Sequence, residues 1–325
     1  MTMVIRVHET GGPEVLQVED LEIGDPGPGE AKIRHEAIGL NYIDTYFRSG
    51  LYPAPAGLPF TPGNEGAGTV VAVGEGVNEI AAGDRVAYVG AIGSYAQERL
   101  ISAASVVKIP DAIDMRTGAA MMLKGLTAQY LLRQTFPVKP GQTLLFHAAA
   151  GGVGLIACQW ANALGATVIG TVGSDEKAEL ARAHGCHHVI NYQTEDFVER
   201  VGEITDGGKC DVVYDSVGND TYPGSLDCLK PRGMWVSFGQ SSGPIEDFNL
   251  GLLGQKGSLY ACRPVLFTYI AKRESLVAMA NEMMELIADG TIRIEVRQDF
   301  ALQDAADAHR ALEGRRTTGA TVLVP

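Results

Sequence analysis

A glycine-rich turn in the middle of the chain constrains the fold more than any other feature. The apolar segment Thr143–His147 leads into the turn Ala148–Gly154, which reads AAAGGVG. This turn follows the pattern G-x-G-x-x-G of dinucleotide-binding folds, with Ala149 in the first glycine position. A helix-forming stretch, Val153–Leu164, comes next, and a second apolar strand begins at Thr167. The sequence therefore predicts a strand–helix–strand unit whose helix N-terminus binds phosphate groups.

The residues expected to contact those phosphates are Ala150, Gly151, Gly152 and Val153. A glycine at 151 lets the backbone approach a pyrophosphate, and a glycine at 154 lets the helix pack close to the strand. The alternative is a tight strand–helix turn with no ligand, which a lone glycine run does not exclude. The complete strand–helix–strand context favours the dinucleotide interpretation.

The segment that follows predicts a parallel sheet with helices on both faces. Strands and helices alternate regularly, as is typical of a doubly wound α/β sheet. The predicted strands are Thr143–His147, Thr167–Thr171, His188–Ile190, Asp211–Tyr214 and Met234–Phe238, and the predicted helices are Val153–Leu164, Asp175–His184, Thr194–Ile204 and Asp220–Leu229.

The N-terminal third has a different texture, with short β-type runs separated by glycine and proline turns. It predicts an irregular antiparallel β-domain, a partly open barrel, to which we expect the C-terminal residues to return. The predicted elements here are strands Met3–His8, Ala31–Leu40, Gly68–Val73, Arg85–Tyr88, Val106–Ile109 and Ala320–Val324, and helices Met115–Leu132, Glu274–Ile287 and Asp304–Leu312.

The net charge indicates which partners are disfavoured, and the cysteine content indicates the cellular compartment. A net charge of −13 disfavours nonspecific binding to nucleic acid or to acidic membranes. The five cysteines form an odd, widely spaced set without a CxxC pair, which indicates free thiols in a reducing compartment. No secretory signal is evident, so we expect a cytoplasmic protein. The most apolar stretch, 143–172, contains polar residues and predicts buried strands and a helix rather than a membrane span.

The end of the second predicted strand favours NADP(H) over NAD(H). NAD-binding units carry an acidic residue about 20 residues after the turn, but Thr171–Ser174 contains none. Asp175 and Glu176 come next and fit the first turn of a helix capped by the preceding serine. Lys177 lies where it would reach a 2′-phosphate, and Tyr192 follows the third strand beside it. Alternatively, Lys177 is a solvated helix lysine and the two acids bind the ribose of NADH.

Several motifs along the whole chain resemble those of zeta-crystallin-like quinone oxidoreductases, a zinc-free branch of the medium-chain dehydrogenase/reductase superfamily. The motifs are Asn41-Tyr-Ile-Asp44, Pro62-Gly-Asn-Glu-Gly-Ala-Gly68, Lys124-Gly-Leu-Thr-Ala-Gln129, Ala148–Gly154, Asp215-Ser-Val-Gly218, Ser237-Phe-Gly239 and Gln255-Lys-Gly-Ser258.

The resemblance implies an α/β protein with two domains. A GroES-like, β-rich catalytic domain would comprise residues 1–124 and 268–325, and a Rossmann domain with a doubly wound parallel sheet would comprise 125–267. It also implies NADPH as cofactor, a nicotinamide lying between the domains, and a homodimer formed mainly through Rossmann-domain edges.

The same resemblance gives a reason to expect no metal. Zinc-dependent alcohol dehydrogenases of the superfamily carry Cys where this chain has Asn41, and Gly-His-Glu where it has Gly63-Asn64-Glu65. A catalytic zinc needs three soft or borderline ligands, and amides bind it poorly. The first 150 residues contain no cysteine, so the four-cysteine structural zinc lobe is absent as well.

Without a Lewis acid, direct reduction of an electrophilic acceptor is the easier chemistry. A quinone or an enone accepts hydride because the developing negative charge delocalises onto oxygen, and the protein supplies position and hydrogen-bond donors. The catalytic candidates are Asn41, Tyr46 and Tyr52. Asn41 would offer its amide N–H to a carbonyl oxygen and also contact the cofactor. Each tyrosine has the alternative of simple packing.

Further cofactor contacts are expected where parallel strands end, because doubly wound sheets bind ligands at that edge. These residues are Ser216, Val217, Phe238 and Gly239. The resemblance adds Thr127, and it adds Arg315, although the adjacent Arg316 is an alternative. His147 precedes the glycine turn; a buried, hydrogen-bonded role is favoured over that of a general base.

The function predicted is NADPH-dependent reduction of quinones, with NADPH-dependent reduction of an enone or 2-alkenal as the alternative. Both reactions need the same hydride geometry, so the residues do not separate them. A binding protein is the competing class. RNA binding would require a basic stripe that the chain lacks, whereas an NADPH sensor without turnover remains open.

Overall fold

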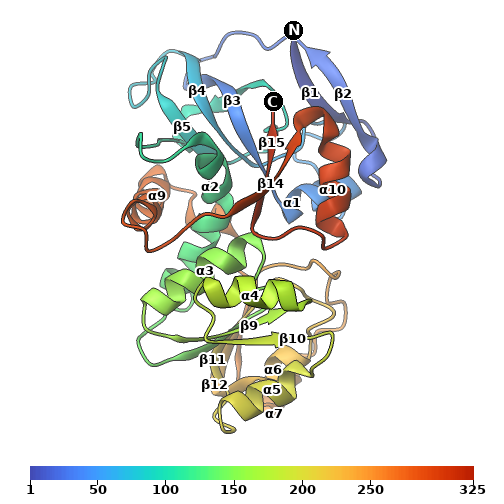
Figure 1. Ribbon diagram of the computed structural model, residues 1–325. Helices are drawn as coiled ribbons and strands as arrows, with labels where there is room; N and C mark the ends of the chain where they lie inside the picture. Colours follow the sequence, from blue (N-terminus) through green and yellow to red (C-terminus); the bar gives the residue numbers. More distant parts are fainter. The chain divides into compact units, whose positions relative to one another are not determined.

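The computed structural model describes residues 1–325 as two compact units, each with its own sheet (Figure 1). Unit 1 comprises Met1–Leu126, Ile270–Asp289 and Ile294–Pro325, and unit 2 comprises Thr127–Tyr269 and Gly290–Arg293. No helix combines the length and apolar character that crossing a membrane requires.

Unit 2 contains a six-stranded, fully parallel sheet in the order β10-β9-β8-β11-β12-β13. Counted from β8, this order is 3-2-1-4-5-6, the arrangement of dinucleotide-binding Rossmann folds. The predicted α/β class with a doubly wound sheet is confirmed. The strands are β8 (Thr143–Phe146), β9 (Thr167–Val172), β10 (His188–Asn191), β11 (Cys210–Asp215), β12 (Leu229–Ser237) and β13 (Tyr260–Cys262).

Helices cover both faces of this sheet, with α3 and α4 on one side and α5 and α6 on the other (Figure 1). Apolar side chains from the strands form a core against them, among them the fully buried Leu145, Ile169 and Val213. Burial on both faces explains the apolar runs in the central strands, such as LLF in β8 and VV in β11. The helices are α3 (Gly152–Ala163), α4 (Asp175–Ala183), α5 (Phe197–Ile204), α6 (Gly224–Asp227), α7 (Gly251–Gln255) and α8 (Leu266–Tyr269).

Unit 1 is built on a mainly antiparallel sheet in the order β14-β15-β3-β4-β5-β7, with β6 also paired to β3. Strands β1 and β2 form a separate hairpin. The last strand, β15, pairs with β3, so the C-terminal residues complete the sheet that the N-terminal residues begin. The strands are β1 (Thr2–Val7), β2 (Leu16–Leu21), β3 (Glu30–Leu40), β4 (Glu65–Val73), β5 (Arg85–Val89), β6 (Glu98–Ser102), β7 (Val106–Lys108), β14 (Val296–Ala301) and β15 (Ala320–Val324).

Four α-helices accompany these strands: α1 (Tyr42–Ser49), α2 (Met115–Tyr130), α9 (Arg273–Ala288) and α10 (Ala305–Glu313). Short 3-10 turns lie at Pro13–Val15, Ala103–Ser105 and Leu302–Asp304, and α2 runs on into a π-helical turn, Leu131–Thr135.

Three predicted helices differ from the structure. The helix expected over Asp220–Leu229 is wrong except for α6, because Pro223 disfavours helical backbone at the residue before it. The helix expected from Thr194 starts at Phe197, since the Asp196 side chain caps its first N–H groups. The helix expected to end at Leu132 changes to the π-helical turn after Tyr130. Helices α1, α7 and α8 and strands β2, β6, β13 and β14 lay outside the predicted elements.

Candidate functional site

The glycine-rich turn forms a tight link between β8 and α3. Ala148 takes a left-handed backbone with φ of 55°, and the Ala149 N–H donates to the Thr171 carbonyl at 3.0 Å. A Cβ on Gly154 would lie 2.4 Å from the Ala148 carbonyl oxygen, so only glycine fits there. Gly151 stands at the N-cap of α3 without a side-chain cap. The Gly151 N–H donates to the Ala148 carbonyl at 2.9 Å, so of the predicted phosphate contacts Gly152 and Val153 supply the first N–H groups of α3, which have no partner within the helix and suit an anionic ligand.

The residues predicted to recognise a 2′-phosphate follow the ends of the neighbouring strands β9 and β10. The Ser174 hydroxyl caps α4 by accepting from the Lys177 N–H at 3.3 Å. The Tyr192 N–H donates to the Val172 carbonyl at 3.1 Å. A Cβ on Gly173 would lie 2.5 Å from the Tyr192 phenol oxygen, so a side chain at 173 would displace that ring. Asp175 and Glu176 occupy the exposed first turn of α4, as predicted.

A single buried carboxylate, that of Asp215 at the end of β11, organises the neighbouring strand ends. Its side chain is wholly buried and accepts hydrogen bonds from five groups at 2.8 to 3.2 Å. The donors are the N–H groups of Val217 and Gly218, the hydroxyls of Thr221 and Ser225, and the indole N–H of Trp235. These bonds fix the loop that carries the predicted cofactor contacts Ser216 and Val217.

His147 extends this network towards the other strands. Its ring lies 2.9 Å from the Thr171 hydroxyl and 3.1 Å from the Ser225 hydroxyl. Burial lowers the pKa of His147, so the ring is neutral. Burial alone would raise the pKa of Asp215, but its surroundings, with His147 and the hydrogen-bond donors, lower it below the ordinary value. Because His147 is neutral, we attribute the lowered pKa chiefly to the donors.

The ends of β11 and β12 also approach closely. The Phe238 N–H donates to the Asp215 carbonyl at 2.8 Å, and a Cβ on Gly239 would lie 2.7 Å from the Ser216 carbonyl oxygen. The structure thus brings Ser216, Val217, Phe238 and Gly239 together at one edge. Thr127 is buried in the part of α2 that belongs to unit 2.

In unit 1, Asn41 lies between β3 and α1 and contacts a buried ion pair. Its Nδ2 donates to Glu65 Oε1 at 2.8 Å and lies 3.4 Å from the Gly39 carbonyl oxygen. Lys124 Nζ donates to the same Glu65 oxygen at 2.6 Å, while Oε2 accepts from the Leu123 N–H at 2.7 Å. Glu65 and Lys124 are both buried. The predicted role of Asn41 as a donor to a substrate carbonyl therefore competes with Glu65.

The residues at these positions do not fit a catalytic zinc. Both Glu65 oxygens accept hydrogen bonds, and a lysine ammonium supplies the positive charge beside them. The Asn64 amide donates to the Gly90 carbonyl at 2.9 Å. Nowhere in the structure do three His, Cys, Asp or Glu side chains group as a metal site would require.

Asp44 fixes the start of α1 and hence the backbone of Asn41. Its Oδ2 accepts from the Asn41 N–H at 2.9 Å and from the Tyr95 hydroxyl at 3.0 Å. Burial raises the pKa of Asp44 to about 7. Tyr95 in turn lies 3.0 Å from His309 on α10, and Arg48 lies 3.1 Å from the same ring.

The two predicted tyrosines lie on and just after α1. The rings of Tyr46 and Tyr52 meet edge to face at 5.2 Å, and the Tyr52 N–H donates to the Tyr46 carbonyl at 2.9 Å. Both rings are half-buried. Arg315 is an exposed residue of unit 1 just after α10, with a left-handed φ of 56°.

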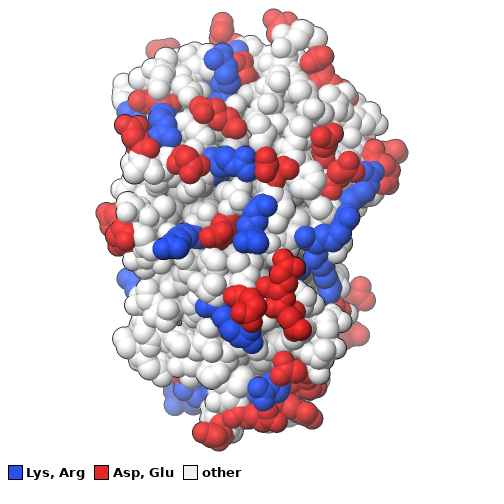
Figure 2. Space-filling model, in the orientation of Figure 1, with Lys and Arg blue, Asp and Glu red and all other residues white.

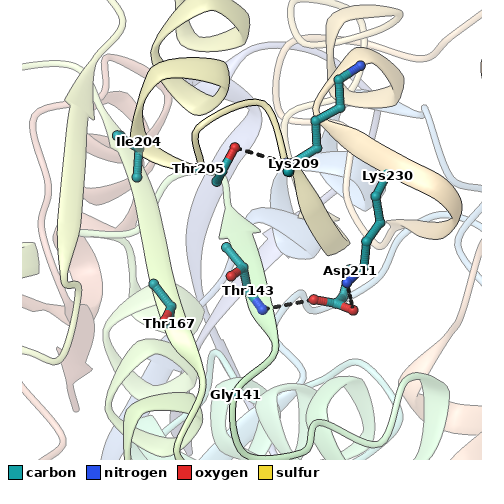
Figure 3. Close-up of a pocket in the computed structure, with 9 residues that line it drawn as sticks. Gly141, Thr143, Thr167, Ile204, Thr205, Lys209, Asp211 and Lys230 are labelled. Carbon is teal, nitrogen blue, oxygen red and sulfur yellow. Dashed lines mark hydrogen bonds and ion pairs between the residues drawn. The ribbon is translucent and has the colours of Figure 1, made fainter.

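A separate pocket opens at the amino ends of β8, β9 and β11, the opposite edge of the sheet from the glycine turn (Figure 3). Asp211 pairs there with Lys230 and accepts from the Thr143 N–H at 2.9 Å. The polar groups at its centre are thus paired with one another. Its lining residues are Gly141, Thr143, Thr167, Ile204, Thr205, Gly208, Lys209, Asp211 and Lys230.

Comparison with known proteins identifies the class. Residues 27–111 match the family described as alcohol dehydrogenase GroES-like domain, and residues 152–283 match the zinc-binding dehydrogenase family. The quinone oxidoreductase of Pseudomonas aeruginosa is 58% identical over 100% of both chains. The crystal structure of Escherichia coli quinone oxidoreductase complexed with NADPH has a TM-score of 0.97 and 53% identity, covering 99% of this chain and 100% of that one.

A third relative has a different named activity. The 2-haloacrylate reductase of a Burkholderia species is 46% identical over 100% of this chain and 99% of its own. The chain is therefore an oxidoreductase of the medium-chain dehydrogenase/reductase superfamily. Within that superfamily, it belongs to the quinone oxidoreductase family, which confirms the resemblance seen in the sequence.

Several residues that shape these sites were not predicted from the sequence. Lys124 and Asp44 were named only as members of longer motifs, without a role of their own. The Asn-x-x-Asp spacing of Asn41 and Asp44 is nevertheless a helix-capping signal. Asp215 also stood in a motif, but no local pattern shows that its carboxylate binds residues 20 positions away. No pattern in the sequence indicated that the Asn191 amide donates a hydrogen bond to Asp175.

The first prediction concerns the buried Glu65–Lys124 pair. Lys124→Met should lower the free energy of unfolding by about 3 to 5 kcal/mol, because it leaves a buried carboxylate without its cation. Adding Glu65→Gln to the same chain should recover part of that loss. Urea unfolding followed by circular dichroism measures both. Equal stabilities for the single and double variants would show that the pair is not coupled.

The second prediction concerns Asp215. Asp215→Ala should lower the free energy of unfolding at pH 7 by about 3 kcal/mol or more, because several buried donors lose their acceptor. Since the folded-state pKa lies below the ordinary value, this contribution is complete above about pH 4 and disappears as the pH falls through the lowered pKa.

The difference between wild type and Asp215→Ala should therefore shrink in acid. The control is Asp247→Ala, which removes an exposed carboxylate of unit 2 and should change stability little at any pH. A difference that stays constant between pH 7 and pH 3 would contradict an ionised Asp215.

Proposed function

We propose that this chain is an NADPH-dependent quinone reductase that works without zinc. One observation carries the proposal: at the carboxyl edge of the parallel sheet, an uncapped helix N-terminus follows β8, and a lysine and a tyrosine follow the neighbouring strands β9 and β10. The first suits a pyrophosphate and the second suits a 2′-phosphate. The structure of the Escherichia coli relative in complex with NADPH supports the same cofactor.

The proposed cofactor contacts fall into three groups. The pyrophosphate would lie on the turn, the 2′-phosphate at the ends of β9 and β10, and the nicotinamide half near the ends of β11 and β12. The corresponding residues are Ala150, Gly151, Gly152 and Val153; then Gly173, Ser174, Lys177 and Tyr192; then Ser216, Val217, Phe238 and Gly239, with Asn41, Thr127 and Arg315 as further candidates.

NADPH, when bound, supplies a hydride to an electrophilic acceptor. The residues of this chain would bind and orient the reactants and donate hydrogen bonds to the oxygen on which charge develops. We propose Asn41, Tyr46 and Tyr52 for this catalytic role. The Glu65 carboxylate holds the Asn41 amide in one orientation, and Tyr46 and Tyr52 support each other's rings. Because Asn41 and Asn64 carry amides and Lys124 pairs with Glu65, activation by zinc plays no part in this proposal.

We also propose a second class of acceptor, which is tested in the same way as quinones. The 46% identity to a 2-haloacrylate reductase favours reduction of an activated carbon–carbon double bond as the alternative. Hydride addition to such a bond also develops charge on a conjugated oxygen, so the same donors would serve.

We also propose a cytoplasmic homodimer. The five cysteines form no disulfide, which suits a reducing compartment. The short strand β13 forms one edge of the six-stranded sheet, and Tyr260 in it and Val265 just after it are each 53% exposed. An apolar sheet edge of this kind suits pairing with a second copy.

We do not propose nucleic acid as a partner of this chain. The face shown in Figure 2 carries scattered Lys and Arg side chains, most of them beside Asp or Glu, rather than a basic stripe. The net charge of −13 acts in the same direction.

The test of this function is an assay of quinone-dependent NADPH oxidation. Chelator-treated protein should oxidise NADPH when 1,4-benzoquinone or 9,10-phenanthrenequinone is added, and it should oxidise NADH much more slowly. The nicotinamide absorbance follows both reactions. Rates on a 2-alkenal and on 2-haloacrylate decide between the two acceptor classes. Tight NADPH binding without oxidation by any acceptor would contradict an enzyme and indicate a nucleotide sensor.

A matched pair of lysine variants tests the assigned cofactor site. Lys177→Ala should raise the KM for NADPH about tenfold or more and leave that for NADH unchanged, because a charge-assisted contact to phosphate is lost. Lys209→Ala removes a lysine from the pocket at the amino edge and should change neither value. An unchanged KM for NADPH in Lys177→Ala would remove Lys177 from the site.

A further inference from the structure

We propose that Asn191 determines the preference for NADPH over NADH by holding the Asp175 carboxylate on the β10 side of the site. The inference rests on the proposed function, because it assumes a nicotinamide dinucleotide at the ends of β9 and β10. It assigns a specificity role to a residue that would not itself touch the cofactor.

Asp175 is the acidic residue nearest to the end of the second strand. NAD-binding sheets use such a residue to accept a hydrogen bond from the ribose 2′-hydroxyl, and its charge repels a 2′-phosphate. In this chain Asp175 begins α4, directly after the capping Ser174 and two positions before Lys177. A negative charge so close to the lysine would weaken phosphate binding unless its position were controlled.

Asn191 supplies that control. The last residue of β10, it pairs with Val172 of β9, and its Nδ2 donates to Asp175 Oδ1 at 2.8 Å. Asn191 Oδ1 accepts from the Gln193 N–H at 3.2 Å, so the amide cannot rotate by half a turn without losing that bond. A rotated amide would also set its oxygen against the Asp175 carboxylate. The N–H group therefore faces Asp175 in the only orientation that satisfies both partners.

The turn that carries Asn191 is held by further bonds. The Asn191 N–H donates to Glu195 Oε2 at 3.0 Å, and the Asn191 carbonyl accepts from the N–H groups of Thr194 and Glu195, each at 3.0 Å. Glu195 pairs with Arg200 of α5 at 2.8 Å. The donor to Asp175 is thus a fixed feature of the turn. Without it, the Asp175 carboxylate would be free to turn towards the ribose, where it repels a 2′-phosphate and accepts from a 2′-hydroxyl.

A double-mutant cycle on Asn191 and Asp175 tests this inference. The dissociation constants of NADPH and NADH are measured by nicotinamide fluorescence, so the result does not depend on turnover. Asn191→Ala should lower the preference for NADPH about tenfold, the size of one hydrogen bond to a charged group. Asp175→Ala alone should keep or increase the preference. The preference of the double variant for NADPH should lie within about twofold of that of Asp175→Ala, because the carboxylate that repels the 2′-phosphate is absent from both.

Asn191→Asp provides a second variant that preserves the turn. It keeps the acceptor for the Gln193 N–H, removes the donor that faces Asp175 and adds a negative charge beside that carboxylate, so the preference for NADPH should fall further than in Asn191→Ala. If Asn191→Ala weakens both cofactors equally, or if the double variant stays as unselective as Asn191→Ala, the residue merely supports the turn and the inference is overturned. A wild-type protein that binds NADPH selectively but reduces no acceptor would contradict the proposed function alone.

Discussion

The candidate cofactor site depends on the hydrogen bonds that the buried carboxylate of Asp215 accepts. Five donors from β12, α6 and the loop after β11 converge on it, and Ser225 passes the network to His147 and then to Thr171 on β9. A buried charge is tolerated only when its hydrogen-bonding capacity is filled, so the strand ends are tied together by necessity. The loops that start at these ends carry most of the proposed cofactor contacts.

Unit 1 buries the Glu65–Lys124 ion pair beside Asn41. Lys124 Nζ lies 2.6 Å from Glu65 Oε1, and Asn41 Nδ2 donates to the same oxygen at 2.8 Å. A single ammonium neutralises one carboxylate but offers no open coordination position. The reaction that we propose uses no Lewis acid, which suits acceptors that are electrophilic already.

The sequence alone predicted the Rossmann sheet, the glycine turn and the family, because these depend on periodicity and on local motifs. It also placed Ser174 as a helix cap and His147 in a buried, hydrogen-bonded position, as the structure has them. It did not predict α1, whose eight residues are too few for a clear period, or the helix break at Pro223. The hydrogen bonds from Asn191 to Asp175 and from Trp235 to Asp215 join distant residues, and one sequence carries no signal of them.

Hydrogen–deuterium exchange of the full chain tests most directly whether the carboxyl edge of the sheet binds NADPH. The account predicts that NADPH slows exchange in residues 150–155, 173–178 and 216–218, and that NADH gives weaker protection in 173–178, where the 2′-phosphate would lie. Amides at the opposite edge, in residues 205–209, should exchange at the same rate with and without cofactor. Protection that is absent from the first three segments, or equal for both cofactors in 173–178, would contradict the account.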